Sequence, residues 1–445
     1  MLSSSPKPDS QLGLWGDLMS QLDQKHPLFI LSNKINWTLF EDAFRKHYSE
    51  KMGKPSKPIR LMVGLLILKQ VRNLSDENVV AHWSENLYYQ YFCGQQSFRP
   101  AIPCVPTELV AFRKRIGEEG VELILKESIR LNEPPDDAGK VVLSIDTTVQ
   151  EKNITYPTDD KLYKKIITKC WKIADEENVS LRQSYTRTVK KLSAEQRFKT
   201  SKYGAKRARK ANRRIKTIAA TLVRELSRKL SLEGLGKHLS QLKLYWKVLL
   251  QKRGDSNKIY SLHEPDVRCY TKGKAHKKFE FGSKVSVVVC QKTGIIMGAL
   301  NFSQNLHDSK TIPQVLDQYE RLTGSEAKEA FVDRGYRGMS SYKNTKIQIP
   351  KPDKNISTTK RRKHSKRAAI EPIIGHLKFN YRMGRNYLKG ILGDALNAML
   401  AAAAMNFQRA MNLWRTEANL RWKLMLHYIN HVYGTLLLFV SKPTF

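Results

Sequence analysis

Two short apolar runs, each leading into an acidic residue, most constrain the fold of this chain. Residues 140–148 read Lys-Val-Val-Leu-Ser-Ile-Asp-Thr-Thr, and residues 329–333 read Glu-Ala-Phe-Val-Asp. Continuous apolar runs of this length are typical of strands buried on both faces of a sheet. We therefore expect two central strands, the first ending at Asp146 and the second at Asp333. Taken singly, an Asp in such a place is more often a cap of the following turn.

The long interval between these strands has a helical and basic pattern. Ile215, Ile218 and Leu222 recur at helical spacing, and Arg187 to Lys216 holds thirteen Lys or Arg against one acid, Glu195. We predict a basic helical insertion over residues 159–258 that contacts phosphate groups. The residues chosen for this role are Lys206, Arg207, Arg209 and Lys210. For any single lysine, a solvated face is the alternative.

Strand signals return after the insertion. Alternation from Phe279 to Val289, the turn Lys292-Thr293-Gly294 and the run 295–300 predict a hairpin. Asp308-Ser309 is predicted to cap a helix that stops at Gly324. Residues 346–350 are expected to be a strand, residues 351–367 a basic loop, and the chain after Glu371 helical.

The first 132 residues have a mostly helical pattern. Helices are expected over residues 59–71 and 76–91, and a third helix opens at Thr107 with a basic end, Arg113-Lys114-Arg115. Short helices with a basic last member suit a helix-turn-helix-like DNA reader, in which these three cations bind DNA. A helical bundle that only supports the next domain is the alternative. Residues 132–137 are predicted to be a linker.

The overall charge indicates a polyanionic partner. The chain has 78 Lys plus Arg against 41 Asp plus Glu, a formal net charge of +37, so nucleic acid is the first candidate. No run offers the roughly 20 uninterrupted apolar residues that a spanning helix needs. The closest run, Leu424 to Val440, contains His427, Asn430 and His431. With no secretion signal at the N-terminus, we expect a cytoplasmic protein with neither a membrane partner nor a small-molecule substrate.

Any metal site in this chain should be built from oxygen ligands. The five cysteines are scattered, with no C-x-x-C pair and no histidines at zinc spacing, and no Gly-rich phosphate loop is present. Glu371 is the third candidate acid. On one continuous helix it would share a face with His364, Arg367 and Lys378, although Pro372 predicts that the helix is kinked or begins there. A surface salt bridge explains Glu371 alone equally well.

Together, Asp146, Asp333 and Glu371 resemble the Asp-Asp-Glu active site of ribonuclease H-like nucleic-acid enzymes. Arg367, Glu371 and Lys378 match the R-x3-E-x6-K signature of the insertion-sequence-5 family of bacterial DDE transposases. Asp333-Arg334-Gly335-Tyr336 is similar to the family's second-acid motif and residues 144–148 to its first. Residues 61–115 resemble its N-terminal helical domain, so the likeness covers nearly the whole chain. His364 stands where the family often has tyrosine.

The resemblance implies an α/β (α+β) fold, a ribonuclease H-like mixed sheet flanked by helices. It implies a helical DNA-binding domain over residues 1–132, catalytic segments over 133–158 and 259–412 on either side of the insertion, and a C-terminal helical segment over 413–445. Two Mg²⁺ ions, for which Mn²⁺ can substitute, would be held by Asp146, Asp333 and Glu371. Arg367, Lys378 and His364 would contact phosphate. His307 and Lys284 are weaker candidates for supporting roles.

The implied activity is metal-dependent cleavage and strand transfer of double-stranded DNA, at terminal inverted repeats and target DNA, by a homodimer or higher oligomer. Two other functions stay open. One is a ribonuclease H-like nuclease without strand transfer, and the other is a catalytically inactive, transposase-derived DNA-binding protein.

Overall fold

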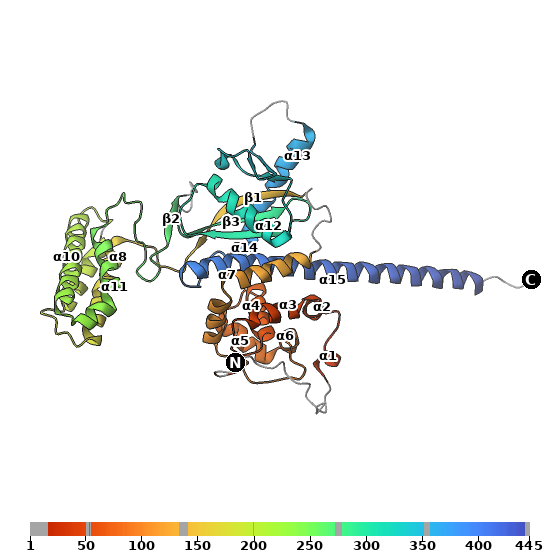
Figure 1. Ribbon diagram of the computed structural model, residues 1–445, viewed down its shortest axis with the longest axis horizontal. Helices are drawn as coiled ribbons and strands as arrows, with labels where there is room; N and C mark the ends of the chain where they lie inside the picture. The colour runs from red at the N-terminus through yellow and green to blue at the C-terminus, as the bar shows by residue number, and fades with distance from the viewer. Residues whose placement is uncertain are drawn as a thin grey trace, which may run out of the picture.

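A computed structural model gives the architecture of the chain (Figure 1). It describes residues 17–49, 53, 55–132, 141–198, 200–271, 278–350 and 357–440, without the side chains of residues 360 and 417–440. Most of the predicted linker, residues 133–137, and the first part of the predicted basic loop, residues 351–356, lie outside these ranges.

Helices form the described part of the N-terminal region. They are α1 (Leu18–Gln21), α2 (Pro27–Lys34), α3 (Trp37–Arg45), α4 (Ile59–Val71), α5 (Asp76–Glu85), α6 (Leu87–Phe92) and α7 (Pro106–Arg130). The basic triplet does not end its helix, because α7 continues to Arg130 past a kink at Gly117, whose φ is 62°. Side chains of these helices share one hydrophobic core with the sheet and with α15 (Gly390–Val440).

A seven-stranded mixed sheet forms the centre of the molecule. Its strands are β1 (Val142–Glu151), β2 (Arg268–Thr271), β3 (Phe279–Cys290), β4 (Ile296–Phe302), β5 (Glu329–Phe331), β6 (Ser341–Tyr342) and β7 (Thr345–Gln348). Their order is β2-β3-β1-β5-β7-β6, and β4 also pairs with β3. Helices α12 (Ile312–Thr323), α14 (Ile370–Asn380) and α15 pack on this sheet. This arrangement confirms the predicted α/β fold.

The hairpin and the helix after it are also confirmed. Strands β3 and β4 pair antiparallel, and Gly294 in the turn has a φ of 70°, which glycine adopts without strain. Helix α12 ends at Gly324, whose φ of 74° is the left-handed conformation of a helix C-cap. Asp308 is not a helix cap as predicted, because His307 caps the short helix η2 (Asp308–Thr311) through its own ring nitrogen.

The first strand is longer than its apolar run. Strand β1 continues to Glu151, so the prediction that it ends at Asp146 is wrong. Antiparallel pairing with β3 continues the strand, from Leu143 opposite Cys290 to Glu151 opposite Gly282. Because a strand is held by its neighbour's backbone, polar residues beyond the apolar run can remain in the ladder.

The basic insertion forms a separate body beside the sheet (Figure 1). It contains α8 (Asp159–Glu176), α9 (Thr186–Glu195), η1 (Gln196–Phe198), α10 (Ala205–Lys229) and α11 (Leu232–Leu250). The apolar faces of α8, α10 and α11 enclose a hydrophobic core of their own, centred on buried residues such as Ile166, Ile218 and Leu222. The insertion therefore buries its apolar residues without using the sheet.

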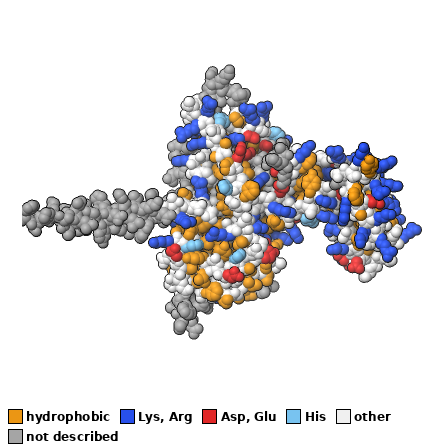
Figure 2. All heavy atoms as spheres, turned by 180° about the vertical axis from the view of Figure 1, so that it is seen from behind, with side chains coloured by type: hydrophobic (Ala, Val, Ile, Leu, Met, Phe, Trp, Pro, Cys, Tyr) orange, Lys and Arg blue, Asp and Glu red, His pale blue; other side chains and the backbone are white. Residues whose placement is uncertain are grey.

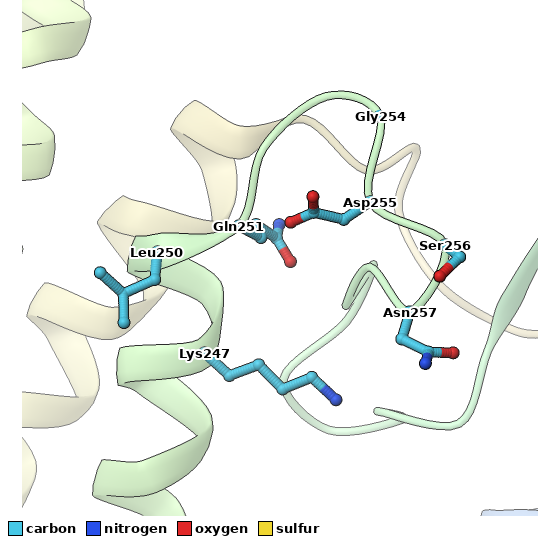
Figure 3. Close-up of a pocket in the computed structure, with 7 residues that line it drawn as sticks. All are labelled: Lys247, Leu250, Gln251, Gly254, Asp255, Ser256 and Asn257. Carbon is cyan, nitrogen blue, oxygen red and sulfur yellow. The ribbon is translucent and has the colours of Figure 1, made fainter.

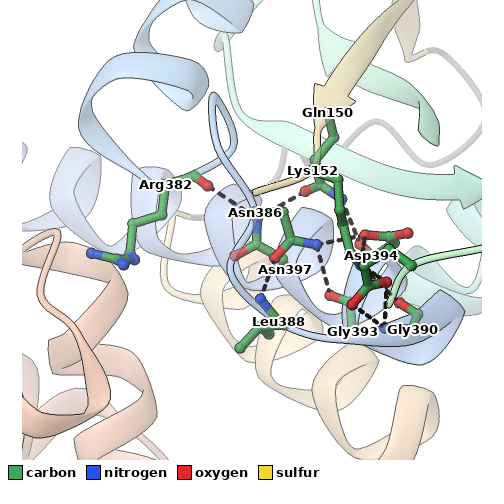
Figure 4. Close-up of polar contacts among 10 residues, drawn as sticks. Gln150, Lys152, Arg382, Asn386, Leu388, Gly390, Gly393, Asp394 and Asn397 are labelled. Atoms are coloured by element: carbon green, nitrogen blue, oxygen red, sulfur yellow. Dashed lines mark hydrogen bonds and ion pairs between the residues drawn. The ribbon is translucent and has the colours of Figure 1, made fainter. Parts of the chain in front are cut away.

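A buried polar network fixes the point where the insertion joins the sheet (Figure 4). Lys152, just beyond β1, donates to Asp394 Oδ1 at 2.6 Å and lies 3.3 Å from Glu264 Oε2. Asn386 Nδ2 donates to the same Asp394 oxygen at 2.6 Å. Burial raises the pKa of Asp394, and Lys152 opposes that rise. Because Lys152 precedes the insertion and Glu264 follows it, the network ties both connections to α15.

The predicted loop over 351–367 is helical in its described part, where α13 runs from Thr358 to Arg367. The 51-residue helix α15 extends well past the body of the molecule (Figure 1). Its part Gly390–Thr416 is long and apolar enough to cross a membrane, with a mean hydropathy of 1.2 in its 18-residue apolar window, but 78% of that window is buried inside the protein. This segment is therefore a core helix.

Candidate active site

Sheet pairing brings together the two segments that carry Asp146 and Asp333. Strands β1 and β5 are parallel, with Val142 opposite Glu329 and Ser144 opposite Phe331. Continued by two residues, this register sets Asp146 opposite Asp333, and neighbouring strands lie about 4.8 Å apart. Asp333 follows the end of β5, where the chain leaves the sheet. The register therefore points to Asp146, in the middle of β1, and Asp333, just past the end of β5, as neighbours across the two strands.

Local hydrogen bonds orient both carboxylates. The backbone N of Thr147 donates to Asp146 Oδ1 at 2.8 Å, and the backbone N of Gly335 donates to Asp333 Oδ1 at 2.8 Å. Both side chains are half-buried, so each carries its charge at the rim of the core while remaining in reach of a ligand. Two adjacent carboxylates repel each other in this setting unless a cation is present.

Tyr336 lies fully buried beneath this pair. Burial raises its pKa well above the ordinary value, and the charges of Asp146, Asp308 and Asp333 raise it further. Its hydroxyl lies close to Thr147 but makes no hydrogen bond of ordinary geometry with any residue that the structure describes. The charges of three carboxylates therefore act on one buried hydroxyl.

Asp308 is the acid that sequence reasoning missed as a site residue. Its Oδ1 accepts from Lys284 Nζ at 2.7 Å and from Thr147 Oγ1 at 3.0 Å. Lys284 also donates to the carbonyl of Leu306 at 2.6 Å. Lys284 is the feature of the sequence that could have revealed this contact, because a lysine within a central, otherwise apolar strand requires a negative charge nearby. His307, the other weak candidate, is occupied in capping η2.

Glu371 is not brought together with the two aspartates. It lies exposed in the first turn of α14, and its backbone N donates to the carbonyl of Ala368 at 3.1 Å. Pro372 has no N–H to continue this ladder, so α13 and α14 are separate helices joined by Ala368 and Ala369. Of the two geometries that Pro372 left open, the helix therefore begins there.

This break also divides the predicted phosphate contacts. The expectation that all of them share one helix face is wrong, since His364 and Arg367 belong to α13 and Glu371 and Lys378 to α14. The His364 ring packs edge-on against Phe331 of β5, with centroids 4.8 Å apart. Arg367 and Lys378 are both half-buried. Glu371 and Lys378 are seven residues apart on α14 and share one face.

The site suits a divalent ion only in part. Carboxylate oxygens are the ligands that Mg²⁺ prefers, and it is commonly bound by one or two carboxylates together with water and substrate phosphates. Asp146 and Asp333 meet that requirement. Among the described residues, no three His, Cys, Asp or Glu side chains lie close enough to hold a metal ion together. A metal here would thus need oxygens from water or phosphate besides the aspartates.

Arg113 is a structural residue, contrary to the prediction that it binds DNA. It is buried, and its Nη1 and Nη2 donate to the two carboxylate oxygens of Asp76 at 2.7 and 2.6 Å. Lys69 Nζ lies 2.8 Å from Asp76 Oδ1. The neighbouring cations remain accessible, because Lys114 is exposed and Arg115 lies over the ring of Tyr48 at 4.6 Å.

The cations chosen on the insertion do face solvent. Lys206, Arg207, Arg209 and Lys210 are all exposed on α10, whereas Ala208 between them is buried. Lys and Arg side chains cover much of the insertion's visible face in Figure 2. These four cations lie on the helical insertion, whereas Asp146 and Asp333 lie on the sheet. They therefore form a basic surface that is separate from the carboxylate site.

A hollow of about 620 Å³ lies at the end of α11 (Figure 3). It is lined by Lys247, Leu250, Gln251, Gly254, Asp255, Ser256 and Asn257. Its one carboxylate, Asp255, accepts from the backbone N of Lys252 at 2.7 Å. With a single acid that is already engaged, this hollow offers no alternative to the aspartate pair.

Comparisons with known proteins identify two regions of the chain. Residues 16–115 match the model of a transposase domain, and residues 257–407 match that of a transposase DDE domain. The second match contains Asp333 and Glu371. A protein of Rhizobium meliloti, described as an uncharacterized protein ORF8 in the nfe locus, is 39% identical over 181 residues, which are 40% of this chain and 86% of that protein. No solved structure matches the chain.

Proposed function

The chain belongs to the DDE transposases, and from this premise we propose that it mobilises a bacterial insertion sequence of the insertion-sequence-5 type. It would bind the terminal inverted repeats, cut the DNA there and join the ends to target DNA. The pairing of β1 with β5 carries the proposal, because it supports Asp146 and Asp333 as one acidic pair at the sheet. Double-stranded DNA is the substrate, and the net charge of +37 supports that choice.

Asp146 and Asp333 would hold the divalent metal that DDE transposases generally use, with Mg²⁺ proposed and Mn²⁺ able to replace it. A metal held by these two residues would supply Lewis-acid activation of a hydroxyl nucleophile and stabilisation of the leaving oxygen. Thr147 N and Gly335 N fix one oxygen of each aspartate and so orient the pair for this task. The buried Tyr336 beneath them keeps water from the inner side of the site.

Glu371 is proposed as the third acid of the reaction. The support is its match to the family signature and its place on α14, which packs against β1. Its exposed carboxylate would act from the DNA side of the site, and Lys378 on the same helix face would bind the adjacent phosphate. Arg367 and His364, on α13, would contact DNA backbone farther along.

Recognition of the element ends is proposed for the helical N-terminal region, with Lys114 and Arg115 facing the DNA. The insertion would bind the phosphate backbone of the DNA through Lys206, Arg207, Arg209 and Lys210. Since two ends must be joined together, the active species is proposed to be a homodimer or a higher oligomer. It would work in the cytoplasm, without a membrane partner.

Strand transfer by the purified full chain tests this proposal. DNA carrying the flanking element ends is incubated with Mg²⁺ or with EDTA, and joined products are resolved on a gel. We expect joining with Mg²⁺ only, and its loss in Asp333→Ala with end binding retained. Asp317→Asn, which removes an acid from a surface ion pair with Lys343, is the matched control. Cleavage without joining would indicate a nuclease, and binding alone a catalytically inactive protein.

A further inference from the structure

The contacts of Asp308 are divided between its two oxygens. Oδ1 is occupied by the Lys284 ammonium and the Thr147 hydroxyl. Oδ2 is turned toward the turn that carries Asp333. Both Oδ2 of Asp308 and Oδ1 of Asp333 lie beside the position that a Cβ on Gly335 would take, at 3.6 and 3.0 Å. A side chain at residue 335 would fill the space between these two carboxylates.

Asp308 is linked in the same way to Asp146. Thr147, whose hydroxyl donates to Asp308, is the residue whose backbone N donates to Asp146 Oδ1 at 2.8 Å. The fully buried Tyr336 side chain is close enough to all three acids for their charges to raise the pKa of its hydroxyl. Asp308 therefore binds the hydroxyl of Thr147, whose backbone supports Asp146, and lies beside Gly335, whose backbone supports Asp333.

We propose that Asp308 is a positioning residue for the metal site, which neutralises Lys284 and binds the Thr147 hydroxyl in β1 so that Asp146 and Asp333 can bind a divalent ion. This inference rests on the proposed function, since it concerns the same metal. Lys284 is a half-buried cation next to a site that must attract one. Without Asp308, its ammonium would be uncompensated and would repel the metal, and no other described acid is seen to bind it.

The net charge of the site determines whether each variant should bind the metal ion more tightly or more weakly. Asp146, Asp333, Asp308 and Lys284 together carry a net charge of about −2. Asp308→Asn keeps the shape and leaves about −1, whereas Lys284→Met leaves about −3 and the double change about −2 again. Removing both partners thus restores the original balance. A purely structural role for Asp308 gives no such restoration.

Binding of Mn²⁺ to the full chain without DNA, followed by the electron spin resonance signal of the free ion, tests this. Asp308→Asn is expected to weaken Mn²⁺ binding by roughly tenfold, as changes in residues that orient metal ligands commonly do. Lys284→Met is expected to strengthen it, and the double variant to bind better than Asp308→Asn alone. Asp317→Asn should bind like the wild type, and Asp333→Ala should lose the ion.

Three results would overturn the proposal. These are equal Mn²⁺ affinity in Asp308→Asn and wild type, no gain on adding Lys284→Met, or no Mn²⁺ binding by the wild type. If Asp308→Asn does not fold, as judged by thermal unfolding, the Lys284→Met variant decides alone, because unchanged affinity contradicts the charge argument. Strand transfer is a separate measurement. A wild type that binds Mn²⁺ in this pattern but joins no DNA would refute the proposed function and leave the role of Asp308 intact.

Discussion

Two basic segments that look alike in the sequence have opposite roles in the structure. Arg113-Lys114-Arg115 on α7 and Lys206 to Lys210 on α10 are both dense runs of cations on amphipathic helices. Arg113 is buried against Asp76, whereas all four cations of the second run are exposed. The two runs differ in the acidic residues that neighbouring helices place beside them. Helix α5 presents Asp76 to α7, while the solvent-facing side of α10 carries an excess of cations with few acids nearby.

The comparison shows that the density of Lys and Arg predicts a phosphate surface only where tertiary packing leaves the cations accessible. Lys69 and Lys152 give the same lesson, since both are buried in ion pairs, with Asp76 and with Asp394. Burying a cation costs several kcal/mol unless a carboxylate is within hydrogen-bond distance. Paired cations thus serve folding, and only the exposed ones are accessible to a phosphate group.

The largest effect is expected for Arg113→Ala. It leaves the partly buried Asp76 with Lys69 as its one remaining ion-pair partner among the described residues, so the free energy of unfolding should fall by about 3 kcal/mol, as for other broken buried ion pairs. Urea unfolding of the full chain measures this. Lys114→Ala, one residue away and exposed, should change stability by no more than about 0.5 kcal/mol. If the Arg113→Ala protein is as stable as the wild type but binds DNA more weakly, the prediction that Arg113 binds DNA would be supported.

Replacing the four cations of α10 with glutamine should affect DNA rather than folding. Lys206, Arg207, Arg209 and Lys210 are exposed, so unfolding should be nearly unchanged. DNA affinity should drop by roughly tenfold or more, and the slope of log K against log salt should fall by about 0.9 for each phosphate that the variant no longer neutralises. Fluorescence anisotropy at several salt concentrations measures both.

The matched control for that variant removes four other exposed cations of the insertion, Lys243, Lys247, Lys252 and Arg253. It changes the net charge by the same amount. If it lowers affinity and slope equally, general charge explains the result. An unchanged slope in the α10 variant would mean that its cations are only solvated.

The last expected effect concerns pH and Lys69. Burial, followed by the charge of Arg113, lowers the pKa of Lys69 from 10.5 to about 8. Between these values the unfolded chain holds a proton that the folded chain lacks, so stability from this group increases as pH rises, by at most about 1.4 kcal/mol per pH unit. The difference in unfolding free energy between wild type and Lys69→Met should therefore grow from pH 8 to 10.5. A flat difference, like that expected for Lys114→Met, would contradict this.

Local chemistry made some elements predictable. The hairpin of β3 and β4 was predicted from alternation and a Gly turn, and the end of α12 from Gly324. These features depend on residues close in sequence. The end of β1 was not predictable from its apolar run, because pairing with β3 extends the strand to Glu151. Helix α13 was missed since its composition is almost entirely polar and basic.

The candidate site divides in the same way. Sequence selected Asp146, Asp333 and Glu371 through their motifs, and Pro372 through its missing N–H. The pairing of β1 with β5, whose register continues toward the two aspartates, involves residues far apart in the chain, such as Ser144 and Phe331. Asp308 joined them only in the folded chain, because its partners Thr147 and Lys284 lie on two different strands.

By itself, the sequence determined the kind of protein this is: a strongly basic chain with two acid-bearing strands, a basic helical insertion and the signature of a DDE transposase. Residue type and spacing are sufficient for that, because motifs and periodicity are local. Only the tertiary structure decided which charges are available. Arg113 and Lys69 are neutralised by Asp76, and Lys284 by Asp308, through contacts that no spacing rule encodes. Electrostatic pairing depends on distance in space, and folding sets that distance.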